Sequence, residues 1–445
     1  MTLAKKGFTV HGMDAAPAVL ATLAAKRAHL FEPGVDDGLH AFLGDRLHVA
    51  AELPADLDAV VICVSTPVDP ATHVPDLDNL RAAARHAAAH CRPGTLVIVR
   101  STVPVGATRS VVLPELAARW PRVRLAFAPE RTIQGQALRE LEELPQVVGG
   151  LDAESASLAS ALFARVTTRV LTVTSLEAAE LTKLVNNCHT DLIYSYGNEV
   201  ALIAERFGLD PLEVIRAANV DYPRPDLAKP GFVGGGCLSK DPYILLSAAE
   251  RAGYRPFLVG RARELNEHLP VHAAERVVAM IRGARGSAEG AVLGILGWAY
   301  KGWPPTDDMR GGPVPPMLPL FRAAGLTLRG HDFLVAPERI TALGAAPGTV
   351  DEAFAGADAV LVTVNHPEYT KLDLPRLLAS MRRPAVLYDS WRVLDEDVVR
   401  GADVGYAGIG YMGGPDMAPH TPQRSGHPGG PGAPVGPPRA PQPYA

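Results

Sequence analysis

Short, almost wholly apolar runs alternate along most of the chain with longer segments in which apolar residues recur at helical spacing. Such runs of Val, Ile, Leu and Ala are typical of strands buried on both faces of a parallel sheet. The alternation predicts an α/β fold with doubly wound sheets, in which ligands bind at the carboxyl ends of the strands. The clearest predicted strands cover residues 59–64, 95–100, 124–128, 291–297, 359–364 and 385–389.

One long helical pattern separates two groups of these strands. It runs from Ser175 to Phe207, with Ser175 as a suitable N-cap and with Glu177 and Glu180 in the early turns. Another helical stretch covers about 259–285, and long helices in this position often carry subunit contacts. We therefore expect a Rossmann-like domain over 1–172, a central helical and dimerisation domain over 173–284, a second Rossmann-like domain over 285–411 and a tail over 412–445.

The beginning of the chain is unusual for a Rossmann unit. Residues 1–8 read as the end of a helix capped by Gly7, and residues 8–13 read as a strand that ends at Asp14. An acidic residue there usually binds the ribose hydroxyls of NAD, and the alternative is a solvated turn aspartate. No strand with G-x-G-x-x-G comes before it, so the usual pyrophosphate cradle has no residues to form it. We expect either a start placed late in a longer protein or a cofactor that is held in another way.

Composition narrows the class of protein. A chain of 445 residues is too long for one core, and 47% hydrophobic with 20% charged residues is ordinary for a globular enzyme. The net charge of −5 and the lack of a long basic run point away from nucleic acid and anionic membranes. The four cysteines lack metal-ligand spacing and no apolar run is long enough to span a bilayer, so we expect a cytoplasmic enzyme without a metal. The Pro/Gly-rich tail is predicted to be disordered.

The stretch from Lys229 to Tyr243 carries the first candidate for chemistry. Three glycines, Gly234 to Gly236, directly precede Cys237 and permit backbone conformations that a Cβ resists. If a helix begins at Leu238, Cys237 lies at its N-terminus, where the helix dipole and Lys240 favour the thiolate. Cys237 is then a candidate nucleophile. The alternative is a buried structural cysteine beside a glycine turn.

Other polar side chains occur where a ligand of such a fold would lie. Thr66 and Thr102 follow two predicted strands, and Glu130 follows a third. Lys183 and Asn187 are four residues apart on the long helix, so they share one face, as an oxyanion or phosphate site requires. The alternative for Glu130 is a glutamate at the rim of the sheet, and the alternative for Lys183 is an ordinary surface lysine.

A charged loop follows the first strand of the second predicted domain. Lys301 and Arg310 flank a turn that also contains Asp307 and Asp308. Two cations at the ends of strands suit a diphosphate, whereas a solvated run of charges is the alternative.

The order of the motifs resembles the UDP-glucose/GDP-mannose dehydrogenase family over roughly residues 1 to 410. The motifs are S-T-P at 65–67, S-T-V-P-V-G at 101–106, A-P-E-R at 128–131, E-L-T-K-L-V-N-N at 180–187, G-G-G-C-L-S-K-D at 234–241 and K-G-W-P-P-T-D-D-M-R at 301–310. The resemblance implies two Rossmann-like domains, one for NAD and one for a UDP-sugar, joined by a long helix that forms the core of a homodimer. It also implies that NAD oxidises the C6 alcohol of a nucleotide sugar to a carboxylate, a reaction of polysaccharide biosynthesis.

The resemblance further implies catalytic roles for residues named above. Cys237 corresponds to the nucleophile that passes through a thiohemiacetal and a thioester. Lys183 and Asn187 correspond to groups that stabilise the oxyanion. Glu130 corresponds to the acid/base of thioester hydrolysis, and Asp241 to a residue that positions water, a role shared with Thr102.

Binding roles are implied in the same way. The NAD contacts correspond to Asp14, Thr66, Ser101, Thr102, Lys240 and Arg310. The contacts to the sugar nucleotide correspond to Glu130, Arg131, Lys183, Asn187, Phe232, Gly234, Gly235 and Lys301.

The chain departs from the family pattern at three places. The first strand and its glycine-rich turn are missing, and Gly311 and Gly312 replace an acidic residue and a serine. D-S-W-R at 389–392 replaces Asp-Gly-Arg, which leaves a sugar contact by Arg392 open. P-E-R at 129–131 resembles the branch that acts on UDP-N-acetylhexosamines, so we expect UDP-N-acetylmannosamine or UDP-N-acetylglucosamine, with UDP-glucose as the alternative. Two hypotheses of other kinds are an impaired, truncated homologue that only binds sugar nucleotide and a one-step alcohol dehydrogenase without covalent catalysis.

Overall fold

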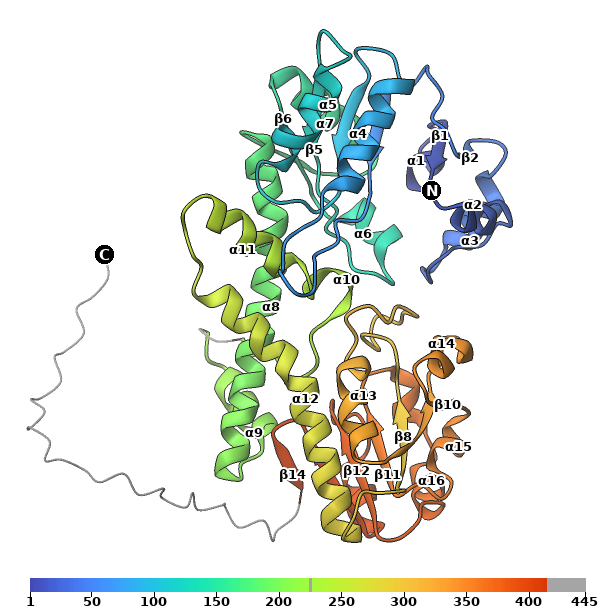
Figure 1. Ribbon diagram of the computed structural model, residues 1–445, viewed down its shortest axis with the longest axis vertical. Coiled ribbons are helices and arrows are strands. Elements are labelled where there is room, and N and C mark those ends of the chain that lie inside the picture. Colours follow the sequence, from blue (N-terminus) through green and yellow to red (C-terminus); the bar gives the residue numbers. More distant parts are fainter. Residues whose placement is uncertain (224–225, 414–445) are drawn as a thin grey trace, which may run out of the picture.

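A long helix, α8 (Leu176–Phe207), connects two α/β lobes at opposite ends of the molecule (Figure 1). The computed structural model describes residues 1–223 and 226–413. Ser175 caps α8 as predicted, because its hydroxyl accepts a hydrogen bond from the backbone N–H of Ala178 at 3.1 Å. The helix ends at Gly208, whose φ of 68° is left-handed and suits glycine.

The first lobe is built on a five-stranded sheet in the order β3-β4-β5-β6-β7. Its pairs are parallel except for the antiparallel pair β5–β6. In β4, Val97 and Val99 pack towards α4 and α5, whereas Leu96 and Ile98 pack towards α7. Both faces are therefore buried, which explains the unbroken apolar run. The strands are β3 (Ala59–Ile62), β4 (Leu96–Val99), β5 (Arg124–Phe127), β6 (Gln146–Gly150) and β7 (Val170–Val173). The helices are α4 (Asp78–His90), η1 (Thr108–Val112), α5 (Leu113–Ala117), α6 (Ala137–Glu143) and α7 (Ala153–Phe163).

The N-terminal elements form a separate group beside this sheet (Figure 1). They are α1 (Thr2–Lys5), β1 (Val10–Met13), α2 (Pro17–Ala24), α3 (Val35–Phe42) and β2 (Leu47–Ala50). Strands β1 and β2 pair in parallel as a two-stranded sheet, and within the described residues neither pairs with β3. Lys5 and Lys6 join α1 to α6 through ion pairs with Glu142 at 2.8 and 3.0 Å.

The segment after α8 folds into α9 (Pro211–Asn219), α10 (Gly235–Leu238), α11 (Asp241–Arg251) and α12 (Leu258–Arg285). The condition that a helix begins at Leu238, with Cys237 at its N-terminus, is not met. Cys237 lies inside the single turn α10, and the next helix begins only at Asp241. Gly235 opens that turn with a φ of 89°, which makes α10 a local turn around the glycines rather than the start of α11.

The second lobe contains a seven-stranded sheet in the order β10-β9-β8-β11-β12-β13-β14, parallel except for β13–β14. Its strands are β8 (Val292–Leu296), β9 (Thr327–His331), β10 (Ala346–Pro347), β11 (Ala359–Val362), β12 (Ala385–Asp389), β13 (Val404–Gly408) and β14 (Tyr411–Gly413). Its helices are α13 (Val314–Ala323), α14 (Pro337–Ala342), α15 (Val350–Phe354), η2 (Pro367–Lys371), α16 (Leu374–Ala379) and α17 (Glu396–Gly401). Residues 412–413, predicted to begin the disordered tail, belong to β14, and residues 414–445 lie outside the described part of the chain.

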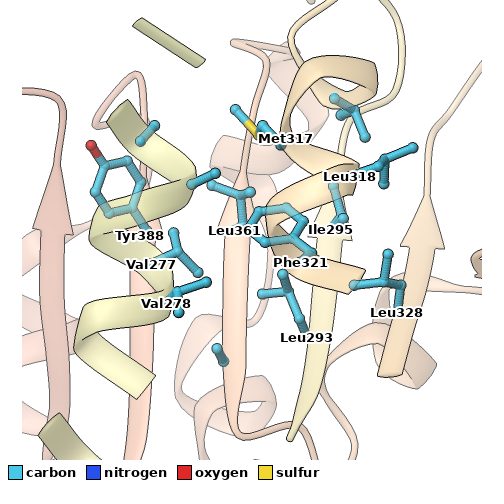
Figure 2. Close-up of a cluster of buried hydrophobic side chains, with 14 of the residues drawn as sticks. Val277, Val278, Leu293, Ile295, Met317, Leu318, Phe321, Leu328, Leu361 and Tyr388 are labelled. Carbon is cyan, nitrogen blue, oxygen red and sulfur yellow. The ribbon is translucent and has the colours of Figure 1, made fainter. Parts of the chain in front are cut away.

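Helix α12 belongs to both the central segment and the core of the second lobe (Figure 2). Its Val277 and Val278 pack with Leu293 of β8 and with Phe321 of α13. Burying each such side chain contributes about 1.5–3 kcal/mol. The second lobe and the central helices therefore share one apolar core. Together with the two sheets, this arrangement confirms the predicted fold class of two doubly wound units joined by a long helix.

No helix in the described ranges is both long and apolar enough to cross a membrane.

Candidate active site

A cleft of about 890 Å³ lies between the two lobes, bordered by α8 and by the loop that carries Cys237. Both lobes contribute to its wall, the first through residues 131–134 and the second through residues 300–310. The predicted site residues that border the cleft are Arg131, Lys183, Asn187, Phe232, Gly234, Gly235, Cys237, Lys301 and Arg310. Residues that are far apart in sequence therefore meet in one space.

Glycines allow the cysteine loop to pack directly against the second lobe. A Cβ on Gly234 would lie 1.8 Å from the carbonyl oxygen of Gly311, and one on Gly235 would lie 2.6 Å from the Tyr300 ring. The Gly235 N–H donates to the same Gly311 carbonyl at 3.3 Å. This close approach gives Gly311, one of the departures from the family pattern, a structural role in the docking of the loop.

The thiol of Cys237 is exposed to the cleft. Burial within the cleft walls raises its pKa, and the carboxylate of Asp241 raises it further. Lys183, Lys240 and Arg310 act in the opposite direction but do not reverse the shift. The prediction that Lys240 and a helix dipole would favour the thiolate was therefore wrong for the net direction. Lys240 donates to Asp241 at 2.6 Å, so its charge is largely paired.

Beside the cysteine, Asp241 links two other predicted residues. It is fully buried and accepts a hydrogen bond from the Asn187 side chain at 2.5 Å and one from Lys240. Lys183, one turn earlier on α8, is buried and forms no hydrogen bond or ion pair to other described residues. Its ammonium is therefore available for a developing negative charge near Cys237.

Glu130 is held at the edge of the first lobe rather than along the cleft wall. Its carboxylate pairs with Arg100 and accepts the backbone N–H groups of Arg131 and Thr132 at 2.7 and 2.8 Å. Burial opposes ionisation, but the charge of Arg100 and these hydrogen bonds outweigh it, and the net effect lowers the Glu130 pKa. At neutral pH Glu130 is a carboxylate and can accept a proton.

The second lobe contributes cations to the opposite wall. Lys301 donates to the carbonyl of Gln134 at 2.7 Å, and burial lowers its pKa to about 8. Arg310 pairs with buried Asp308 through Nε and Nη2, while 63% of its side chain stays exposed. Both side chains are placed to meet an anionic group that enters the cleft.

The predicted NAD contacts of the first lobe lie at the carboxyl ends of its strands. The hydroxyl of Thr66 is buried after β3 and has no hydrogen-bond partner. Ser101, after β4, donates to the carbonyl of Val64 at 2.7 Å. Asp14, after β1, accepts the N–H of Ala16 at 2.8 Å through Oδ1, as an Asx turn does, and its Oδ2 accepts no hydrogen bond from other described residues. The orphaned Thr66 hydroxyl at the strand ends fits a bound dinucleotide, but the described residues contain no glycine-rich turn to cradle its pyrophosphate.

The D-S-W-R segment at 389–392, which departs from the family pattern, uses its arginine within the scaffold. Arg392 adopts a φ of 50° and pairs with Asp210 at 2.5 Å and Glu396 at 2.6 Å, so its guanidinium is used within the scaffold. Trp391 borders the cleft instead. Its indole N–H donates to the Thr363 carbonyl at 2.9 Å, so the one polar atom of the ring is already paired.

Sequence reasoning missed several residues that build this site. Glu32 accepts the backbone N–H groups of Gly135 and Ala137 at 2.7 and 2.8 Å, and so ties the N-terminal group to the loop after Glu130. Glu180, interpreted only as a favourable residue in the first turns of α8, is buried and accepts N–H bonds near Thr102 from Gly106 and Thr108. These partners are separated by many residues, and no local pattern identifies them.

Two doubly wound lobes, with a cysteine, a lysine and exposed cations in the cleft between them, define a nucleotide-dependent oxidoreductase. Three segments match the UDP-glucose/GDP-mannose dehydrogenase family: its NAD binding domain at residues 1–167, its central domain at 177–268 and its UDP binding domain at 294–396. The chain belongs to this family and is an NAD-dependent nucleotide-sugar dehydrogenase. The resemblance inferred from the motifs is confirmed.

Individual relatives are similar to this protein over almost the whole chain. The UDP-N-acetyl-D-mannosamine dehydrogenase of Pyrococcus horikoshii is 31% identical over 405 residues, which cover 89% of this chain and 93% of the relative. A solved structure of UDP-D-ManNAc dehydrogenase from the same organism has a TM-score of 0.81 at 30% identity, covering 92% of this chain and 95% of that one. A UDP-glucose dehydrogenase structure from Pyrobaculum islandicum has a TM-score of 0.80 at 27% identity, covering 92% and 94%.

Proposed function

We propose that the protein oxidises the C6 hydroxyl of a UDP-N-acetylhexosamine, UDP-N-acetylmannosamine or UDP-N-acetylglucosamine, to the uronic acid. The observation that carries the proposal is the cleft that Cys237, Lys183 and Asn187 line together with Lys301 and Arg310 of the other lobe, with buried Asp241 bonded to Asn187. The names of the Pyrococcus horikoshii relative and of the solved structure from the same organism support the N-acetylated sugar. The apolar face of Trp391, with Arg392 paired elsewhere, suits an acetamido methyl group better than a free hydroxyl.

The proposed reaction proceeds through covalent bonds to Cys237. After the alcohol has become an aldehyde, the Cys237 sulfur bonds to C6 as its thiol proton leaves, and the carbonyl oxygen takes up a proton to become the hydroxyl of a thiohemiacetal. Lys183 and Asn187 stabilise the negative charge on that oxygen while the bond forms. The second oxidation converts the thiohemiacetal to a thioester, and water then cleaves the C6–sulfur bond to release the carboxylate and restore the thiol.

Hydrolysis needs a proton acceptor and an oriented water molecule. Glu130 is ionised at neutral pH and serves as the base, while Asp241 and Thr102 position the water. When bound, NAD supplies the hydride acceptor for both oxidations. Asp14, Thr66, Ser101, Thr102, Lys240 and Arg310 would hold it. Glu130, Arg131, Phe232, Gly234, Gly235 and Lys301 would contact the sugar nucleotide, together with Lys183 and Asn187.

UDP-glucose is the second candidate substrate, since a UDP-glucose dehydrogenase superimposes almost as well. A homologue that only binds sugar nucleotide is the alternative of another class. The retention of Cys237, Lys183, Glu130 and Asp241 favours the enzyme.

The deciding measurement is the amount of NADH formed per sugar with excess NAD and a limiting amount of each donor in turn. Two NADH per molecule of UDP-N-acetylmannosamine or UDP-N-acetylglucosamine are expected. One NADH would contradict the covalent route, and no NADH with any donor would favour the binding-only alternative. In Cys237→Ser the reaction is expected to stop before acid release, and normal acid production would refute the thioester.

We further propose a homodimer that works in the cytoplasm, in the synthesis of a polysaccharide precursor. Exposed apolar residues along one side of α8 support the dimer, among them Tyr196 and Ile203. All four cysteines are free, which is typical of a reducing compartment.

A further inference from the structure

The loop that carries Cys237 is hydrogen-bonded to Arg263, a buried arginine of α12. Arg263 donates from Nη1 to the carbonyl of Leu238 at 2.8 Å and from Nη2 to the carbonyl of Val233 at 3.1 Å. These two carbonyls lie on either side of Cys237 in the chain. One planar guanidinium therefore fixes both ends of the segment that carries the thiol.

The arginine is itself fixed by a buried polar network between α8 and α12. Its Nη1 pairs with Asp191 at 2.7 Å, and Asn266 donates to the same Asp191 oxygen at 2.9 Å. Asn198 donates to Asn266 at 2.9 Å and also bonds both the N–H and the carbonyl of Gly231, at 2.8 and 3.0 Å. Each of these four side chains is at most 1% exposed. The network thus reaches the loop at Gly231 as well as beside the cysteine.

A buried ion pair of this kind is costly to desolvate and adds little to stability by itself. Replacing it with apolar side chains would fill the space but would leave the Val233 and Leu238 carbonyls without donors. The charged groups with the largest effects on the Cys237 pKa are Asp241, Lys183, Lys240 and Arg310. The contacts of Arg263 therefore act on the position of the thiol rather than on its ionisation.

We propose that Arg263 is a positioning residue that sets the direction from which Cys237 attacks the aldehyde. The inference rests on the proposed covalent route. Only the steps after the aldehyde require the sulfur, so a displaced loop should slow the second oxidation and leave the first almost unchanged. A displacement of about 1 Å at a reacting atom costs on the order of 100-fold in rate.

The test compares Arg263→Lys with Arg276→Lys. Lysine keeps the charge beside Asp191 but lacks the planar fork through which Arg263 donates to the Leu238 and Val233 carbonyls from two separate nitrogens. Arg276 is a matched control, because it lies on the same helix and pairs with Glu205 of α8 at 3.2 Å, and it forms no hydrogen bond or ion pair to the described residues of the cysteine loop. Circular dichroism and thermal unfolding establish that both variants fold.

Single-turnover reactions with enzyme in excess over the UDP-sugar separate the two oxidations, with hydroxylamine present to trap free aldehyde. For Arg263→Lys we expect the first NADH at close to the normal rate, the second about 100-fold slower and trapped aldehyde in place of acid. For Arg276→Lys we expect the wild-type pattern. Equal slowing of both oxidations, or no slowing of either, would overturn the inference.

A second readout does not depend on turnover. The pH dependence of Cys237 alkylation by iodoacetamide should keep its midpoint in Arg263→Lys, and a shift of about one pH unit or more would show an electrostatic role instead. If Arg263→Lys does not fold, Asn198→Ala releases the same loop at Gly231 and should show the same split between the oxidations. A wild-type enzyme that forms fewer than two NADH per sugar would refute the proposed function itself, which is a different result from a variant that loses only the second step.

Discussion

At the scale of single residues, the lowered pKa of Lys301 predicts that kcat/KM for the UDP-sugar depends on pH. Burial lowers its pKa to about 8, and Glu32 and Glu140 only partly oppose that shift. If its ammonium binds a phosphate, the interaction is present below that pKa and is lost as the pH rises through about 8, since the neutral amine carries no charge. We expect kcat/KM for the UDP-sugar to fall about tenfold or more above pH 8, because this parameter reports groups of the free enzyme.

The matched variant for this prediction is Lys301→Arg, which remains charged throughout the range. Its kcat/KM should lose the fall near pH 8 while the wild type keeps it, as measured from initial NADH rates between about pH 6 and pH 9.5. An identical fall in both proteins would assign the ionisation to another group.

The site could be predicted from sequence only where the relevant residues are close in the chain. Lys183 and Asn187 share a helix face, and Cys237 follows its glycines, so spacing alone identified them and the structure brings them into one cleft. The direction of the Cys237 pKa shift was not accessible, because it depends on burial and on Asp241 pairing with Lys240. Arg263 was missed for the same kind of reason. Its hydrogen-bond partners Asp191, Val233 and Leu238 are separated from it by 25 to 72 residues.

At the scale of elements, the packing of the cysteine loop against the second lobe predicts a strong difference between two neighbouring glycines. A Cβ on Gly234 would lie 1.8 Å from the Gly311 carbonyl oxygen, which is backbone and cannot move alone. A Cβ on Gly236 would lie 3.1 Å from the guanidinium of Arg310, which belongs to a side chain that is 63% exposed rather than to the backbone. Gly234→Ala should therefore displace the loop, whereas Gly236→Ala needs only a small shift of one side chain.

We expect Gly234→Ala to lower kcat by about 100-fold or more, as a displaced nucleophile would, and Gly236→Ala to lower it by less than about tenfold. Steady-state NADH formation gives the rates, and thermal unfolding shows whether each variant is folded. Similar rates for the two variants would mean that the loop does not pack against Gly311 during turnover.

Most elements were predictable because their patterns are local. The buried strands were recognised from their apolar runs, and α8 from its length and its Ser175 cap. The helix after Cys237 was not, because the positive φ of Gly235 creates a separate turn that hydrophobic spacing does not record. The alternation of strands also gave no indication that β1 and β2 pair apart from β3, since pairing depends on which strands are neighbours in space.

At the scale of the whole molecule, the two-stranded sheet predicts uneven local stability. In the described residues β1 and β2 pair only with each other, and no residue of β1 is fully buried, whereas every residue of β4 is buried between two neighbouring strands. We expect amides of Val10–Met13 to exchange with deuterium at least about tenfold faster than those of Leu96–Val99, because few buried contacts must break to open them. Hydrogen exchange read by mass spectrometry measures both segments in one sample.

Addition of NAD extends this test to the cofactor site. If Asp14 binds the ribose, exchange at residues 10–16 should slow on addition of NAD, while exchange in α16 serves as the internal control. If exchange at residues 10–16 does not slow at a concentration of NAD that supports turnover, Asp14 does not belong to the NAD site.

The proposed dimer is a property of the whole molecule that one side of α8 makes testable. The exposed apolar residues of this helix lie within one sector of its surface, since their spacings are close to multiples of a helical turn. They are Leu181, Val185, Ile193, Tyr196, Ile203 and Phe207, each 40% to 69% exposed. A stripe of this length is costly to leave in water, so a second copy of α8 is the expected partner.

A charge placed at the centre of the stripe should break such a contact without disturbing the core, because the side chains concerned point away from it. The double variant Tyr196→Glu, Ile203→Glu should sediment as a monomer at micromolar concentration, while Leu158→Glu, a change at an isolated exposed leucine of α7, should leave the dimer intact. Sedimentation velocity gives the masses. A wild-type monomer, or a dimer that survives the double change, would place any subunit contact elsewhere.

The activity of the monomeric variant is a separate test. If it keeps the wild-type yield of two NADH per sugar, the cleft is complete within one chain. Loss of turnover in a folded monomer would show that α8 pairing holds the two lobes in their working arrangement.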